Sequence, residues 1–91
     1  MSDNFIMNAD ALIYAARQEL KRARQMYPNW PGEDVAHAAA IVMEEAGEVL
    51  KEANNLRWDQ GGDVAALRRE LIQTVAMCLR FAEDTDPKSK S

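Results

Sequence analysis

The chain has 91 residues, of which 47% are hydrophobic, a net charge of −4 and one cysteine. This length fits one domain, the acidic balance argues against a nucleic-acid-binding surface, and a single cysteine excludes an internal disulfide. No run approaches the roughly 18 apolar residues of a transmembrane helix, and the first ten residues lack the basic region of a signal peptide. We therefore expect a soluble cytoplasmic protein that binds neither nucleic acid nor membranes.

Two breaks divide the chain into three helical segments. The breaks are YPNWPG at 27–32 and DQGGD at 59–63, which contain the prolines and glycines typical of turns. The first helix is predicted over residues 10–26, because apolar residues recur there at the spacing of one helix face. Asn8 or Asp10 is its expected N-cap.

The second helix is predicted to begin at Glu33 or Asp34 and to end near residue 55 or 58. Its apolar stripe is rich in alanine, which permits close approach of another helix. The third helix begins near Asp63, and its stripe includes Cys78, which we place in the core. No segment alternates like a strand, so the fold class is all-α, as one domain over residues 1–91 with flexible ends at 1–8 and 85–91.

The segment MEEAGEVLKEANN, residues 43–55, places four glutamates on the second helix. Each residue advances about 100° around a helix. On this spacing Glu45, Glu48 and Glu52 form a row at the edge of the buried face, whereas Glu44 points away from the core.

The segment RRELIQTV, residues 68–75, places Glu70 and Gln73 about one turn apart on the third helix. The short connection makes the second and third helices an antiparallel hairpin, so Glu48 lies near Glu70 and Glu45 lies level with Gln73. Three converging carboxylates repel one another unless a cation neutralises them, and oxygen ligands suit Mg²⁺ or Mn²⁺. The alternative is a plain helical interaction module with a solvated acidic edge.

With these two motifs the chain resembles the MazG-like all-α nucleoside triphosphate pyrophosphohydrolases. That family carries EExxE and then ExxD on two antiparallel helices, and here EEAGE is followed by ELIQ. The similarity covers roughly residues 30–83. The phrases IVMEEAGEVLKEA and LRRELIQTVAMCLRFAE are most similar to the short phage and bacterial members.

The resemblance implies that the chain hydrolyses a (deoxy)nucleoside triphosphate to the monophosphate and pyrophosphate, as in housecleaning of nucleotide pools. It implies Mg²⁺ as cofactor, with Mn²⁺ as a substitute. It also implies a homodimer or homotetramer, in which self-association completes a four-helix-type bundle.

Residue by residue, the resemblance makes Glu45, Glu48 and Glu70 catalytic metal ligands. Glu44 matches the leading glutamate of the first motif, which is also counted among the catalytic residues. Gln73 stands where the family has aspartate, and its neutral carbonyl is a poorer ligand. This departure leaves open a MazG-like protein that binds metal and nucleotide without hydrolysing the nucleotide.

Six further residues are candidates for substrate contact, because a triphosphate needs nearby cations and a base needs stacking or hydrogen-bonding partners. They are Lys51, Glu52, Asn55, Trp58, Arg69 and Glu19. For such residues a surface or packing role is the alternative. Glu19 lies on the apolar stripe of the first helix, where its charge needs a partner such as Arg22 or Arg80.

Overall fold

The computed structural model describes residues 5–87, and within this range the chain forms three helices and no strand. α1 spans Ala9–Met26, α2 spans Val35–Arg57 and α3 spans Val64–Asp84. The all-α prediction is confirmed for this part of the chain, and the bounds agree closely with the expected ones. Residues 1–4 and 88–91, which belong to the ends predicted to be flexible, lie outside the described range. No helix in residues 5–87 is long and apolar enough to cross a membrane.

Each helix begins at a polar capping side chain. The Asn8 side-chain oxygen accepts hydrogen bonds from the backbone N–H groups two and three residues further on, at 2.8 and 3.2 Å. Asp34 and Asp63 cap α2 and α3, and each accepts from the third amide along, at 3.0 and 2.7 Å. These amides have no partner inside the helix, and such caps are each worth about 1 kcal/mol.

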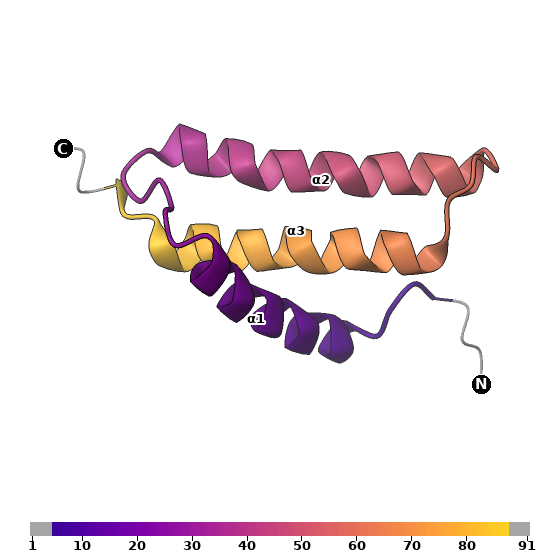
Figure 1. Cartoon of the computed structure of the whole chain (residues 1–91), viewed down its shortest axis with the longest axis horizontal. Coiled ribbons are helices and arrows are strands. Elements are labelled where there is room, and N and C mark those ends of the chain that lie inside the picture. Colours follow the sequence, from indigo (N-terminus) through magenta and orange to yellow (C-terminus); the bar gives the residue numbers. More distant parts are fainter. Residues whose placement is uncertain (1–4, 88–91) are drawn as a thin grey trace.

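α3 is the central helix and packs against both α1 and α2. Figure 1 shows α2 and α3 side by side and running in opposite directions, while α1 crosses the other side of α3 obliquely. Ala16 and Leu20 of α1 are buried against Ala76 of α3. In residues 5–87 the buried hydrophobic side chains are all alanine or leucine, so the core is thin and the helices approach closely.

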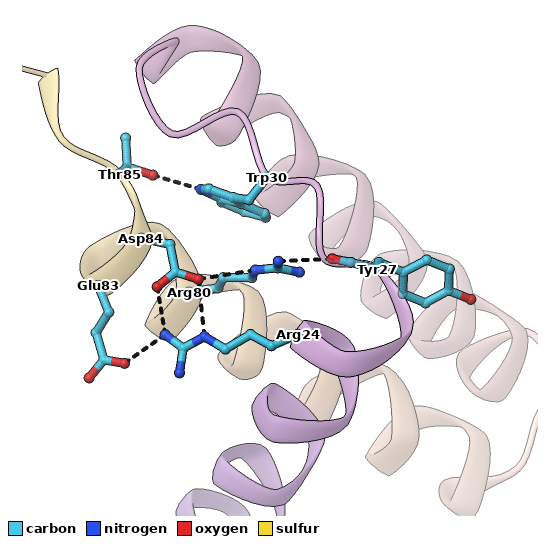
Figure 2. Close-up of polar contacts among 7 residues, drawn as sticks. All are labelled: Arg24, Tyr27, Trp30, Arg80, Glu83, Asp84 and Thr85. Carbon is cyan, nitrogen blue, oxygen red and sulfur yellow. Dashed lines mark hydrogen bonds and ion pairs between the residues drawn. The ribbon is translucent and has the colours of Figure 1, made fainter. Parts of the chain in front are cut away.

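A network of ion pairs joins the C-terminal ends of α1 and α3 (Figure 2). Arg80 is only 4% exposed; its Nε donates to Asp84 at 3.2 Å and its Nη2 donates to the Tyr27 carbonyl at 2.9 Å. Arg24 donates to both carboxylate oxygens of Asp84, at 3.0 and 2.7 Å, and to Glu83 at 2.9 Å. Every charge in this network has an opposite partner, so the network fixes the end of α1 on α3.

The connection between α1 and α2 folds over this network. The Trp30 ring faces the Arg80 guanidinium, which lies 4.9 Å from the ring centroid, and the Trp30 indole N–H donates to Thr85 Oγ1 at 2.9 Å (Figure 2). The Asp86 amide also donates to the Gly32 carbonyl at 2.8 Å. The connection and the end of α3 therefore hold each other in place.

Cys78 is exposed, so the prediction that it belongs to the core is wrong. The buried positions of α3 against α1 are Ala76 and Arg80. Cys78 lies two residues from Ala76, which is about 200° around the helix. The apolar pattern predicts the wrong orientation of α3, because Arg80 is buried. An arginine is ordinarily expected to face solvent.

Candidate functional site

A cleft of about 370 Å³ opens where the three helices meet the connection between α1 and α2. Both polar and apolar side chains line it, and they come from every helix of the described chain. They are Glu19, Arg22 and Ala23 of α1, Tyr27, Asn29 and Trp30 of the connection, Ile41 and Glu45 of α2, and Gln73, Met77 and Arg80 of α3. Three oxygen-bearing side chains from three helices, Glu19, Glu45 and Gln73, thus share one cavity.

Glu45 is the acidic residue of this cleft whose carboxylate form is disfavoured by its surroundings. Burial raises the pKa of the Glu45 carboxyl, and so do the negative charges of Glu70 and Glu48. Smaller effects of the same sign come from Glu44 and Glu19. Among residues 5–87 no lysine or arginine forms an ion pair with Glu45, Glu48 or Glu70. These carboxylates therefore repel one another without local compensation.

The glutamates are near one another but do not form a closed metal cage. Within the described range, no group of three or more histidine, cysteine, aspartate or glutamate side chains is arranged to hold a metal ion. Repulsion favours separated rotamers of these long side chains, and Mg²⁺ keeps several waters, so it needs few direct protein ligands. The donor set, carboxylates of Glu45, Glu48 and Glu70 with the amide oxygen of Gln73, fits a hard divalent cation in its chemistry.

Glu19 has the partner that its place on α1 requires. Arg22 donates from Nε to Oε1 at 2.9 Å and from Nη2 to Oε2 at 2.7 Å, so the pair is bidentate. The Arg22 side chain is 52% exposed. Arg80 is buried and holds Asp84 and Tyr27, whereas Arg22 is paired with Glu19 but remains exposed to solvent at the cleft.

Five of the predicted substrate contacts lie outside the cleft lining: Lys51, Glu52, Asn55, Trp58 and Arg69. Trp58 is 61% exposed and caps α2, about 20 Å along the helix from Glu45. The Arg57 guanidinium lies 4.8 Å from its ring centroid. Asn55 packs against the α2–α3 turn, where a Cβ on Gly62 would lie only 2.7 Å from the Asn55 Cβ.

The remaining predicted residues divide into two groups. Glu70 is half-buried and Glu48 is exposed, and both charges act on Glu45. Glu44 is exposed and lies outside the cleft lining, in line with the prediction that it points away from the core.

Tyr27 and Asn29 also line the cleft, and the sequence pattern did not predict this. Both belong to YPNWPG, which the prolines and glycine marked only as a break. The available signal was an asparagine and two aromatic residues within six positions, directly after a helix that carries Glu19.

We compared the chain with protein-family models, with curated proteins and with solved structures, and found no match in any of the three comparisons. The residues of the cleft and the motifs on α2 and α3 therefore carry the functional inference.

Proposed function

We propose that this chain is a metal-dependent nucleoside triphosphate pyrophosphohydrolase of the MazG-like type, which converts a (d)NTP to the (d)NMP and pyrophosphate. One observation carries the proposal. Glu45 and Gln73 line one cleft, and the negative charges of Glu70 and Glu48 repel the Glu45 carboxylate, with no ion pair within residues 5–87 to offset them. Perturbed carboxylates in a cleft are typical of functional sites, because structural charges are ordinarily paired. An exposed arginine beside them suits a substrate that carries both phosphates and a bound cation.

In this proposal Glu45, Glu48 and Glu70 hold Mg²⁺ or Mn²⁺, with the Gln73 carbonyl as a neutral ligand. When bound, the cation offsets the charge of the triphosphate and activates the attacking water. A cation bound there would offset the repulsion from Glu70 and Glu48 that contributes to the raised pKa of Glu45 in the metal-free protein. Arg22 lies at the cleft wall, where its guanidinium donates to phosphate oxygens, and Ile41 and Met77 keep part of the wall apolar.

A MazG-like protein that binds metal and nucleotide without hydrolysis is the second candidate. The position of Gln73 in the cleft favours it, because the family pattern has a charged aspartate there. One negative charge fewer weakens the attraction for a divalent cation. The two candidates differ in turnover, whereas a plain interaction module would show neither turnover nor cation binding.

The proposal includes self-association as a homodimer or homotetramer in which α2–α3 hairpins form a four-helix-type bundle. The thin core supports this, since a small chain with few buried residues is commonly stabilised by a partner. Its proposed role is cytoplasmic housecleaning of nucleotide pools.

The test is pyrophosphate release from canonical and modified NTPs and dNTPs, in Mg²⁺ and in Mn²⁺. We expect metal-dependent release that falls by about 100-fold or more in Glu48→Ala and in Glu45→Gln. Glu33→Gln is the matched control, since Glu33 is exposed and precedes α2. Absence of release from folded protein that binds Mn²⁺ would overturn hydrolysis and leave the binding protein.

A further inference from the structure

The face of α2 turned away from α3 is exposed and apolar. Ala36, Ala40, Met43, Gly47 and Leu50 are spaced alternately by four and three residues, and all are exposed. Met43 is 67% exposed and Leu50 is 63% exposed. We name these five residues the outer seam. Their spacing is that of a coiled-coil contact line, in which two helices pack along one face of each.

Gly47 at the middle of the outer seam has no explanation within the chain. It lies inside α2, and a Cβ built on it meets nothing within 4 Å. Its φ is not positive, so the backbone does not require glycine there. Glycine inside a helix is destabilising relative to alanine. A second helix that crosses closely at this point would explain the residue, because only glycine lets the two backbones meet.

The charges beside the outer seam fit one relative orientation of two copies. Glu44 and Lys51 lie on the same shoulder of the outer seam, on opposite sides of Gly47 along the helix axis, and both are exposed. They are seven residues apart, about 10 Å, so they do not pair within one helix. In a two-fold antiparallel pair centred near Gly47, each Glu44 faces Lys51 of the partner subunit. A parallel pair would place the two copies of this shoulder on opposite sides of the contact, so it would lack this pairing.

We propose that the outer seam binds the outer seam of a second copy of this chain, with the two α2 helices antiparallel and crossing at Gly47. Glu45 lies about 200° from Gly47 around α2, so this contact leaves the cleft open. The inference does not depend on hydrolysis, because it concerns the opposite face of the helix. Its tests measure mass and cross-linking, so its failure is distinguishable from failure of the proposed activity.

The first test is charge reversal, followed by sedimentation velocity over a range of protein concentrations. We expect Glu44→Lys and Lys51→Glu each to weaken dimerisation by about tenfold or more, because two like-charge contacts arise in each symmetric pair. The double variant restores both contacts and returns the dissociation constant to near the wild-type value. A monomeric wild-type chain, unaffected single variants, or a double variant as weak as the singles would each overturn the proposal.

The second test fixes the orientation by disulfide cross-linking in a Cys78→Ser background. A mixture of Met43→Cys and Leu50→Cys chains is expected to cross-link under oxidation, since the antiparallel crossing at Gly47 brings Met43 of one copy beside Leu50 of the other. Asn54→Cys is the matched control, because the antiparallel crossing separates the two copies of this position by about 21 Å. A cross-link in Asn54→Cys would indicate a parallel pair, and the absence of a cross-link between the Met43→Cys and Leu50→Cys chains would exclude this crossing; either result overturns the proposal.

Discussion

The molecule contains two clusters of charged residues. In one of them each charge has a partner of opposite sign, and in the other the charges have none in the described part of the chain. In the first, Arg80, Asp84 and Arg24 are paired, and the buried guanidinium has a carboxylate, a carbonyl and an aromatic ring around it. In the second, Glu45 is surrounded by negative charge, of which Glu70 contributes the largest part. The first cluster stabilises the fold. The second opposes folding, so its presence indicates a function.

The two clusters respond to acid in opposite directions. Hydrogen bonds from Arg24 hold the pKa of the Asp84 carboxyl below its ordinary value. Asp84 therefore contributes stability above the unfolded pKa of about 4, and this contribution is lost as the pH falls through the folded pKa. The pKa of Glu45 is raised, so ionised Glu45 opposes folding near neutral pH. That penalty disappears as the pH falls through the raised folded pKa to the unfolded value.

The largest expected effect comes from breaking the compensated cluster. Arg80→Met leaves the Tyr27 carbonyl without this donor and removes one partner of Asp84, and we expect a loss of about 3 kcal/mol in the free energy of unfolding. Urea unfolding measures it. Arg22→Met is the matched control: its side chain is 52% exposed, so water screens its pair with Glu19 and we expect a far smaller loss. Equal effects of the two substitutions would contradict the distinction between a buried and an exposed arginine.

A somewhat smaller effect is expected for Asp84→Asn. The substitution weakens the bidentate contact with Arg24 and the contact with Arg80, which together contribute about 2 kcal/mol at pH 7. The difference from wild type should begin to shrink as the pH falls below about 4, where the carboxyl of the unfolded chain is protonated, and it should vanish below the lowered pKa of the folded carboxyl. Urea unfolding at a series of pH values checks this. A difference that stays constant down to pH 2 would show that charge is not the cause.

Gln73→Asp sharpens the comparison by adding a carboxylate to the uncompensated cluster. We expect Mn²⁺ to bind about tenfold more tightly, because one further negative charge faces the cation. Isothermal titration calorimetry measures the affinity. Gln60→Asp, in the exposed α2–α3 connection, is the control that adds the same charge away from the cleft. Equal gains in both variants would indicate a general charge effect and count against a site at Gln73.

The smallest expected effect has the opposite sign to the others. Glu45→Gln should stabilise the protein in a chelator by about 0.5 kcal/mol at pH 7, since it removes like-charge repulsion on α2 and across to α3. The gain should diminish on acidification, as the wild-type carboxyl is neutralised. Thermal or urea unfolding at pH 7 and at pH 4.5 provides the measurement. Destabilisation by this substitution at neutral pH would show that Glu45 has a compensating partner.

Local features of the fold were predictable from sequence, whereas the packing of α3 was not. The helix bounds follow from periodicity. The N-caps can also be predicted, because a cap depends only on residues next to it in sequence; they are Asn8, Asp34 and Asp63. The orientation of α3 depends on two helices at once. Arg80 is buried only because Asp84 and the connection supply its partners, and no count of apolar residues contains that information.

The candidate site shows the same division. Helix spacing alone predicts that Glu45 and Gln73 share a level, and both line the cleft. Tyr27 and Asn29 line the cleft because of the path that the chain takes after α1. That path could not be predicted, because an irregular segment has no periodic pattern. Trp58 shows the opposite error. It follows the acidic motif in sequence and is a predicted substrate contact, but it lies at the C-terminal end of α2, away from the cleft.

The central claim is that the uncompensated glutamates form a cation site, and a Mn²⁺ titration of the wild-type protein beside Glu45→Gln tests it most directly. We predict saturable binding to the wild type at or below millimolar Mn²⁺, weakened by about tenfold in the folded Glu45→Gln variant. Absence of binding at millimolar Mn²⁺, or equal binding by the two proteins, would contradict the claim and leave a solvated acidic edge.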